Sequence, residues 1–203
     1  MIIKKLKQVI STKQIGAIIL AAGKGSRIGF PKLVLKIHDE FAVDIICRKL
    51  MSAGTTQICC IVVSKLNVSQ FSSNHQICWT VNPHPENGMI SSIFNGVQSL
   101  EKSDGYLIVP VDHPMFEFRT VVALVECFSK NPNCAVSPKY KNQSGHPMII
   151  PYEIASKLSE EDYDGGLKQF LVDSNCDMIY VDVDDPGILV NINTKHDLER
   201  IKS

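Results

Sequence analysis

An excess of charge of either sign is missing from this 203-residue sequence, because 21 Lys and Arg residues balance 21 Asp and Glu residues. Proteins that bind nucleic acids broadly usually carry a basic excess, so we expect no nucleic-acid partner. The sequence also lacks an apolar run near the length of a membrane-spanning helix, which needs about 20 residues. Residues 1–7 lack the continuous apolar core of a signal peptide, and we expect no membrane partner.

Paired cysteine motifs are also absent. None of the seven cysteines forms a Cys-x-x-Cys pair, and their number is odd. These features argue against a zinc site. We expect reduced, mostly buried thiols, as is usual in a cytoplasmic protein.

The composition is ordinary for a globular protein, with 44% hydrophobic and 21% charged residues. The length is sufficient for one domain with a full core. The sequence contains no internal repeat, low-complexity segment or linker. We therefore expect an N-terminal arm over residues 1–14 and a single domain over residues 15–203.

Apolar runs typical of buried strands alternate with segments of helical periodicity. This alternation predicts an α/β fold, namely a three-layer α/β/α sandwich with a mostly parallel, Rossmann-like sheet. In the helix that starts at Met89, the apolar stripe leaves Ser91 and Asn95 outside it. Strands are expected at 16–22, 57–63, 76–81, 105–111, 134–138, 146–150 and 178–183, and helices at 41–53, 89–101, 117–129, 151–159, 165–174 and 194–202.

The segment 20–32 reads Leu-Ala-Ala-Gly-Lys-Gly-Ser-Arg-Ile-Gly-Phe-Pro-Lys and follows the first predicted strand. Its glycines allow a tight turn, and its hydroxyl and three cations suit a polyphosphate, which makes a nucleotide the first candidate ligand. It matches neither the P-loop nor the dinucleotide fingerprint, because its glycines are spaced G-x-G-x-x-x-G. The alternative is a surface loop with solvated charges. The residues concerned are Gly23, Lys24, Gly25, Ser26, Arg27, Gly29 and Lys32.

A single acidic residue, Asp112, ends the buried strand predicted at 105–111. Ligands of such sheets bind at the carboxyl ends of the strands, so Asp112 would face the same cleft as the phosphate loop. Carboxylate oxygen suits Mg²⁺, which usually takes one or two protein ligands together with phosphate oxygens. The alternative is that Asp112 caps the following helix.

With these pieces in place, about 180 residues of the chain resemble the MobA-like nucleotidyltransferases, and within them most closely the molybdenum cofactor cytidylyltransferases. The family motifs occur in the same order along the chain. They correspond to residues 20–32 (L-A-A-G-x-S-x-R-M-G…K), 82–93 (N-P…G-M-x-S-S-L), 111–114 (D-x-P), 145–149 (G-H-P-V), 164–168 (G-D-x-G-A-R) and 191–198 (D-I-D-T-P-E-D-L). This chain departs from the pattern by having Ile28 for Met, Pro85 for an aromatic residue, Lys168 for Arg and Asn193 for Asp.

The resemblance implies a nucleotide-diphospho-sugar-transferase type of fold and an Mg²⁺-dependent transfer of CMP from CTP to the molybdopterin cofactor, with release of pyrophosphate. A molybdenum hydroxylase is a candidate protein partner. Two alternatives stay open: a sugar or polyol phosphate as the acceptor, and a nucleotide-binding cofactor chaperone without turnover. Pyrophosphate release with CTP and cofactor would separate an enzyme from a binder.

The resemblance also implies roles for individual residues. The acceptor phosphate is already a nucleophile, so the work of the site is alignment and charge neutralisation. The implied catalytic residues are Arg27, Lys32 and Asp112. The implied nucleotide contacts are Ala21, Ala22, Gly23, Lys24, Gly25, Ser26, Arg27, Lys32, Asn82, Gly88, Ser91 and Ser92; Asp112 and Asn193 would hold the metal, and Gly145, His146 and Lys168 the acceptor.

Several of these roles have structural alternatives. Asp197 or a water could replace Asn193 as the second metal ligand, because an amide brings no charge. His146 precedes a proline at a strand start, where a histidine is often structural. Ser91 and Ser92 could cap a helix. Nearby on the chain, the acidic cluster of Asp182, Asp184 and Asp185 is expected to be a solvated loop.

The choice of base rests on Ala22. The guanylyl branch of the family typically reads L-A-G-G where this chain has Leu-Ala-Ala-Gly at 20–23. The extra methyl group leaves less room for a purine, so we expect CTP to be preferred over GTP.

Overall fold

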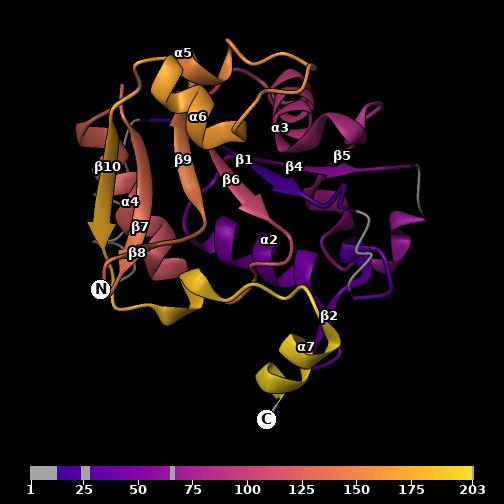
Figure 1. The fold of residues 1–203 in the computed structure, drawn as a ribbon. Coiled ribbons are helices and arrows are strands. Elements are labelled where there is room, and N and C mark those ends of the chain that lie inside the picture. Colours follow the sequence, from indigo (N-terminus) through magenta and orange to yellow (C-terminus); the bar gives the residue numbers. More distant parts are fainter. Residues whose placement is uncertain (1–12, 24–27, 65–66, 203) are drawn as a thin grey trace.

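The computed structural model of the protein describes residues 13–23, 28–64 and 67–202 (Figure 1). Most of the predicted arm, 1–14, and four residues of the predicted phosphate loop, Lys24, Gly25, Ser26 and Arg27, lie outside the described residues. Before β1 (Ile15–Leu20), Asp104 accepts hydrogen bonds from Lys13 Nζ and Gln14 N, both at 2.8 Å. These bonds fasten residues 13 and 14 beside the start of the strand at 105–110.

The described segments contain strands β1 (Ile15–Leu20), β2 (Lys36–Ile37), β3 (Glu40–Phe41), β4 (Gln57–Val62), β5 (Cys78–Val81), β6 (Gly105–Pro110), β7 (Ala135–Tyr140), β8 (Gln143–Ser144), β9 (Met148–Pro151) and β10 (Met178–Asp182). The α-helices are α2 (Ala42–Ser52), α3 (Gly88–Ser99), α4 (Phe118–Lys130), α5 (Tyr152–Ala155), α6 (Gly166–Asp173) and α7 (Lys195–Lys202). Short 3₁₀ helices are η1 (Lys32–Val34), η2 (Val68–Gln70), η3 (Asn74–Gln76), η4 (Pro85–Asn87) and η5 (Pro186–Leu189).

The main sheet has the order β10-β7-β9-β6-β1-β4-β5, with β8 added beside β7. β9 pairs antiparallel with both β6 and β7, whereas β1, β4, β5 and β6 pair parallel, as do β7 and β10. The prediction of a mostly parallel sheet is therefore confirmed.

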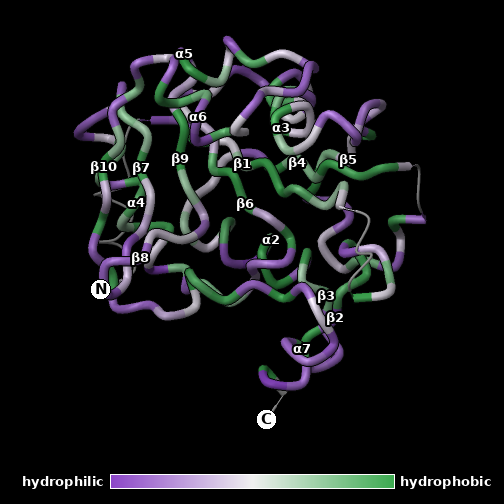
Figure 2. The backbone as a smooth tube through the Cα atoms, viewed as in Figure 1, coloured by the Kyte–Doolittle hydropathy of each residue, from purple (hydrophilic) through white to green (hydrophobic). Residues whose placement is uncertain are grey.

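Alternate residues of the central strands face two separate core clusters, as the pleat of a strand requires. In β1, Ala17 and Ile19 join the cluster with α2 and α4, and Ile18 joins the cluster with α3, α5 and α6. Figure 1 shows α3, α5 and α6 above the sheet and α2 below it, and Figure 2 shows β4 as largely hydrophobic and α7 as largely hydrophilic. The predicted three-layer sandwich is confirmed. No helix in the described ranges is long and apolar enough to cross a membrane.

The packing of α3 on β1 depends on Gly96. A Cβ atom placed at this residue would lie 2.5 Å from Cγ2 of Ile18, a distance that real Cβ contacts do not reach. The absence of a side chain therefore sets how closely the helix approaches the strand. This contact joins the second half of α3 to the middle of β1.

Three local features differ from the prediction. The helix expected at 151–159 is only the four-residue α5, and Ser91 is buried although it was placed outside the apolar stripe. Residues 36–41 form a hairpin of β2 and β3 that the prediction missed. Its two turn residues, His38 and Asp39, have positive φ angles of 45° and 67°, the geometry of a two-residue hairpin loop, but without the usual Asn-Gly signal.

The carboxyl ends of the parallel strands gather the loops of interest at one edge of the sheet. Hydrogen bonds continue between strand partners just past the strand ends. They run from Ala21 N to Ile61 O (2.9 Å), from Asn82 N to Val62 O (2.9 Å) and from Val111 N to Leu20 O (3.1 Å). The segments that begin at Ala21, Asn82 and Val111 therefore leave the sheet side by side.

Asp185 does not behave as expected from its acidic neighbourhood. Its carboxylate is 4% exposed and accepts hydrogen bonds from Glu117 N (2.7 Å), Thr120 Oγ1 (2.6 Å) and Gly187 N (2.9 Å). The prediction of a solvated loop is wrong for this residue, although Asp182 and Asp184 are exposed. Asp185 joins the start of α4 to η5, and both elements flank the carboxyl edge.

Asp185→Ala is expected to lower the free energy of unfolding by about 3 kcal/mol, because buried donors would lose their acceptor. Asp184→Ala is the matched control, since this neighbouring carboxylate is exposed, and its effect should stay within about 0.5 kcal/mol. Urea denaturation of the two variants measures both values. Equal effects would show that the three hydrogen bonds do not stabilise the fold.

Candidate active site

Three predicted site residues from distant parts of the chain meet at the carboxyl edge of β1 and β6. The ammonium group of Lys32 donates hydrogen bonds to Oδ2 of Asp112 and, at 2.7 Å, to Oδ1 of Asn193. Asp112 is 6% exposed, and Lys32 and Asn193 are half-buried. Because the carboxylate is held by a cation and caps no helix, the alternative role of Asp112 as a helix cap is not observed.

The backbone brings these residues together. Ile192 N donates a 2.9 Å hydrogen bond to Asp112 O, which fixes Asn193 beside Asp112. On the other side, Lys49 of α2 donates to Pro114 O at 2.6 Å and so holds the loop that follows Asp112. Burial lowers the pKa of Lys49, and its ammonium also lies 5.3 Å from the ring centre of Phe116.

The segment with Asn193 is fixed from its other end by the start of α7. Asp197 Oδ2 accepts from Asn193 N (3.0 Å) and Thr194 N (2.8 Å), and Asp197 N donates to Thr194 Oγ1 at 3.1 Å. This is a reciprocal capping box. Hydrogen bonding by the Thr194 side chain and by the two N–H groups lowers the pKa of Asp197. Asp197 thus orients Asn193 and is not placed as the second ligand that the alternative required.

The donor set suits a magnesium ion better than a transition metal. The described residues hold no group of three His, Cys, Asp or Glu side chains that could bind a metal ion. Asp112 and Asn193 nevertheless direct two oxygen atoms at one cation, the Lys32 ammonium. One carboxylate and one neutral oxygen fit Mg²⁺, which completes its shell with water and phosphate oxygens.

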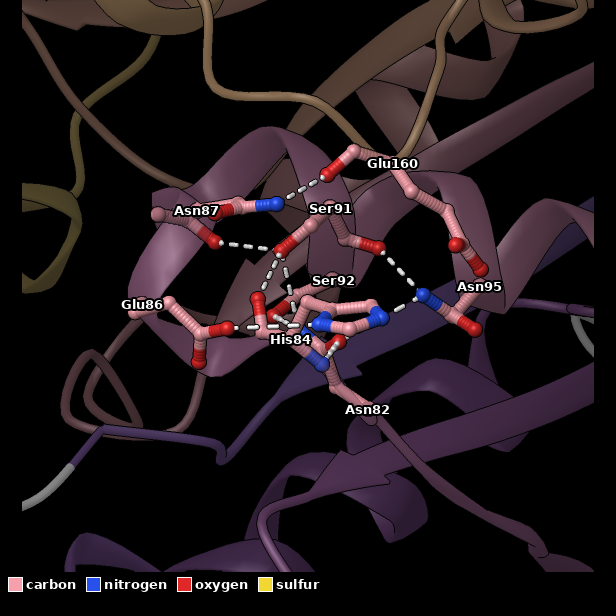
Figure 3. A network of polar contacts seen from close by, with 9 residues as sticks. Asn82, His84, Glu86, Asn87, Ser91, Ser92, Asn95 and Glu160 are labelled. Carbon is pink, nitrogen blue, oxygen red and sulfur yellow. Dashed lines mark hydrogen bonds and ion pairs between the residues drawn. The ribbon is translucent and has the colours of Figure 1, made fainter.

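Asn82 is the centre of a buried polar network at the start of α3 (Figure 3). Its Nδ2 donates to Ser91 Oγ (2.9 Å) and Ser92 Oγ (3.0 Å), and its Oδ1 accepts from His84 N (2.8 Å) and Asn95 Nδ2 (3.5 Å). Asn82 is 1% exposed. All four hydrogen-bonding positions of this amide are thus used inside the protein. Through these hydrogen bonds, the buried Asn82 side chain holds the loop at 82–92 in one conformation.

Ser91 also serves the loop. It is fully buried, and its single hydroxyl proton is shared between two acceptors, His84 O (3.0 Å) and Gly88 O (3.1 Å). Because it donates to carbonyl groups and accepts from no helix N–H, it is not a cap, and neither Ser91 nor Ser92 caps α3. The side chain of Ser91 is therefore used inside the loop, where it supports the backbone at His84 and Gly88.

The turn before α3 joins a second loop. Asn87 Nδ2 donates to Glu160 O at 2.9 Å, which ties η4 to the segment that precedes α6 (Figure 3). Gly88 is exposed and has a φ of 75°, which an L side chain adopts only with strain. A Cβ there would lie 3.5 Å from Asp162 Oδ1. Position 88 therefore favours glycine because of its backbone conformation and not because space is short.

His146 lies beside Asp112, next to a histidine for which the sequence indicated no role. The rings of His113 and His146 meet edge to face, with their centres 4.7 Å apart. The Nδ1 atoms of both rings are buried and have no hydrogen-bond partner among the described residues. Burial lowers the pKa of His113 and lowers that of His146 to about 4, so both imidazoles are neutral at pH 7.

The other two residues predicted to bind the acceptor, Gly145 and Lys168, differ in their relation to His146. Gly145 packs against η5, since a Cβ atom there would lie 2.3 Å from Ile188 O, and His146 N donates to the same carbonyl at 3.1 Å. Lys168 is exposed near the start of α6. It shares no hydrogen bond or ion pair with the described residues of the site, so the structure does not group it with His146.

The visible start of the phosphate loop borders Lys32. A Cβ atom at Gly23 would lie 3.3 Å from Cδ of Lys32, so the lysine side chain runs along the backbone of this glycine. Ala21 is buried, and Ala22 is half-buried against the cluster of α3, α5 and α6. The loop at Gly23 and the end of Lys32 therefore belong to one site.

Sequence reasoning missed two residues of this site. His113 stands within the Asp-His-Pro string of the metal motif, and this adjacency to Asp112 was a usable signal. Lys49 gave no signal, because its hydrogen bond to Pro114 spans 65 positions and depends on the packing of α2.

A mostly parallel sheet with a lysine, a carboxylate and a glycine-containing loop at one carboxyl edge defines an α/β nucleotide-binding protein of the nucleotidyltransferase type. Residues 17–183 match the profile of the MobA-like NTP transferase domain. The chain belongs to this family.

Individual relatives agree with this assignment. A protein of Thermococcus sibiricus named "Probable molybdenum cofactor guanylyltransferase" is 25% identical over 197 residues, covering 91% of this chain and 96% of its own length. A protein of the same name from Bacillus mycoides is 26% identical over 193 residues, covering 89% and 92%. Among solved structures, a nucleotidyl transferase from Methanothermobacter superimposes with a TM-score of 0.72 at 18% identity and covers 93% of this chain and 96% of its own.

The neutral state of His146 predicts a pH dependence of stability. Its pKa of about 4 in the folded protein lies below the ordinary value of 6.5, so the unfolded state binds a proton first. The contribution of neutral His146 to the free energy of unfolding is complete above about pH 6.5 and is lost as the pH falls towards 4. Between pH 7 and pH 5 this residue should cost about 2 kcal/mol of unfolding free energy.

Denaturation of the wild type and of His146→Gln at both pH values measures this contribution. The variant should show the smaller loss between pH 7 and pH 5. Parallel losses in the two proteins would contradict the assigned pKa of His146.

Proposed function

We propose that this protein transfers a nucleoside monophosphate from a nucleoside triphosphate to the terminal phosphate of the molybdopterin cofactor and releases pyrophosphate. The observation that carries the proposal is the convergence of Lys32, Asp112 and Asn193 beside the glycine loop of a MobA-like domain. The names of the relatives support the acceptor. The modified cofactor would pass to a molybdenum hydroxylase.

In this proposal, the residues act by alignment and charge neutralisation. The nucleotide phosphates would lie along the loop at 23–27, with Arg27 at the outer phosphates and Lys32 at the α-phosphate. Asp112 and Asn193 would hold Mg²⁺. When bound, this ion supplies charge neutralisation for the phosphate oxygens. Asn82 would keep the loop at 82–92 in the shape that receives the base and ribose.

The acceptor would lie on the side of the two histidines. His113 and His146 are neutral at pH 7, so they offer hydrogen bonds to an acceptor phosphate without adding positive charge. The positive charge beside Asp112 and Asn193 would then come from Lys32, whereas the ammonium of Lys49 donates to Pro114 O. This keeps the strongest cationic attraction on the phosphate under attack, as transfer requires.

The first test is pyrophosphate release with molybdopterin cofactor, Mg²⁺, and CTP or GTP in competition. We propose CTP as the donor, because the methyl group of Ala22 narrows the space beside the glycine loop. A tenfold preference in kcat/KM needs only about 1.4 kcal/mol of differential binding. GTP is the second candidate, because the curated relatives are named guanylyltransferases.

Preference for CTP, lost or reversed in Ala22→Gly, would support the proposed base. Preference for GTP in the wild type would contradict the proposed choice of CTP but would leave the proposed nucleotidyl transfer intact. No pyrophosphate release with either nucleotide in the presence of the cofactor would overturn the enzymatic proposal in favour of a cofactor chaperone.

The proposed metal ligands give a further prediction. Asp112→Asn should abolish Mg²⁺-dependent pyrophosphate release, because it removes the one negative charge that this pair of ligands offers. Asn193→Asp should preserve or raise the activity, since the family pattern has an Asp there. The free carboxylate of Asp184 provides the control, and Asp184→Asn should leave the rate unchanged. Full activity of Asp112→Asn would place the metal elsewhere.

A further inference from the structure

The most unusual feature of the site is the position of the Lys32 ammonium group. It donates to both oxygen atoms that the site directs at a cation, Oδ2 of Asp112 and Oδ1 of Asn193. The carboxylate of Asp112 is almost fully buried, and the Lys32 side chain is 22% exposed. A buried carboxylate is stabilised by hydrogen-bond donors or by a cation, and Lys32 provides Asp112 with both.

Because the Lys32 ammonium contacts both Asp112 Oδ2 and Asn193 Oδ1, it lies where a divalent ion bound by the same two atoms would lie. Mg²⁺ binds its oxygen ligands at about 2.1 Å, and the shell leaves no space for a second cation between them. The Lys32 Nζ atom already lies within hydrogen-bond distance of the two oxygen atoms that a metal ion would use. Two cations held at this separation would also repel each other strongly in a partly buried site.

We propose that Lys32 and the divalent cation occupy the same position in turn, so that Lys32 fills the metal site of the nucleotide-free protein. This inference rests on the proposed function for the identity of the metal ligands. A divalent ion that arrives alone must displace the lysine and leave its charge unpaired. An ion that arrives with a nucleoside triphosphate meets no such cost, because the phosphates provide a new anionic partner for Lys32.

The exchange makes metal and nucleotide binding cooperative. Any ligand that draws Lys32 away from Asp112 frees the metal site, and metal binding in turn frees Lys32 for the phosphates. By linkage, each ligand must tighten the other by the same factor. The position of the Lys32 side chain along the backbone of Gly23 supports this route, because its flexible end lies between Asp112 and the glycine loop.

The test is Mn²⁺ binding to the purified full chain without nucleotide, followed by the electron paramagnetic resonance signal of free Mn²⁺. The wild type should bind weakly. Lys32→Met should bind Mn²⁺ more tightly by about tenfold or more, a change in the range of ordinary coupling between sites. Lys32→Gln serves as a second variant of the same charge, and circular dichroism establishes that each variant is folded.

Lys36→Met is the matched control. Lys36 is exposed on β2 and lies 4.5 Å from the ring centre of Phe41, so this variant loses one positive charge without touching the two oxygen atoms. Its affinity for Mn²⁺ should equal that of the wild type. The double variant Lys32→Met/Asp112→Asn should lose the gained affinity, which would locate the ion at Asp112.

Unchanged or weaker Mn²⁺ binding in folded Lys32→Met and Lys32→Gln would overturn the exchange, and so would an equal gain in Lys36→Met. These outcomes are distinct from a failure of the proposed function, because the titration contains neither nucleotide nor acceptor. A wild type that releases pyrophosphate while the Lys32 variants gain no affinity would retain the function and reject the exchange. Tighter Mn²⁺ binding by the Lys32 variants, together with a wild type that releases no pyrophosphate, would support the exchange and reject the proposed function.

Discussion

The contact between Lys32 and Asp112 is the interaction on which the arrangement of the site depends. Asp112 is nearly buried, and an unpaired carboxylate in such a place is costly. Lys32 supplies the opposite charge and at the same time binds Asn193, so one ammonium group joins the loop after β1, the loop after β6 and the entry to α7. Charge pairing thus joins three segments that are far apart in the sequence, in addition to the backbone hydrogen bond from Ile192 N to Asp112 O and the apolar packing around it.

The two halves of the site satisfy their polar groups differently. Around Asn82 the hydrogen bonds close on one another, which makes the loop at 82–92 a preformed surface (Figure 3). In His113 and His146, the buried Nδ1 atoms have no hydrogen-bond partner within the part of the chain that the structure describes. In the proposed reaction, the nucleotide would contact the preformed loop at 82–92, and the acceptor would contact the two histidines. The proposed exchange at Lys32 would make binding of the divalent ion depend on binding of the nucleotide.

Much of the fold could be predicted because its signals are local. The seven predicted strands correspond to β1, β4, β5, β6, β7, β9 and β10. The signal is clearest in β1, β4 and β6, which are buried parallel strands and read as continuous apolar runs. The β2–β3 hairpin was missed because His38 and Asp39 occupy its turn in place of the usual residues. Asp185 was misjudged because its acidic neighbours on the chain are exposed, whereas its own partners lie on α4 and on η5.

The sequence by itself determined the class of fold, the glycine loop with its cations, and the choice of Lys32, Asp112 and Asn193 as site residues, because each rests on short motifs or on the period of apolar residues. The tertiary structure alone decided how these residues pair. It placed the ammonium of Lys32 on both oxygen ligands, turned Asn82 and Ser91 into buried supports, set His113 against His146, and left Lys168 apart. Such pairings depend on the register of neighbouring strands and on backbone hydrogen bonds such as Ile192 to Asp112, which no local pattern encodes.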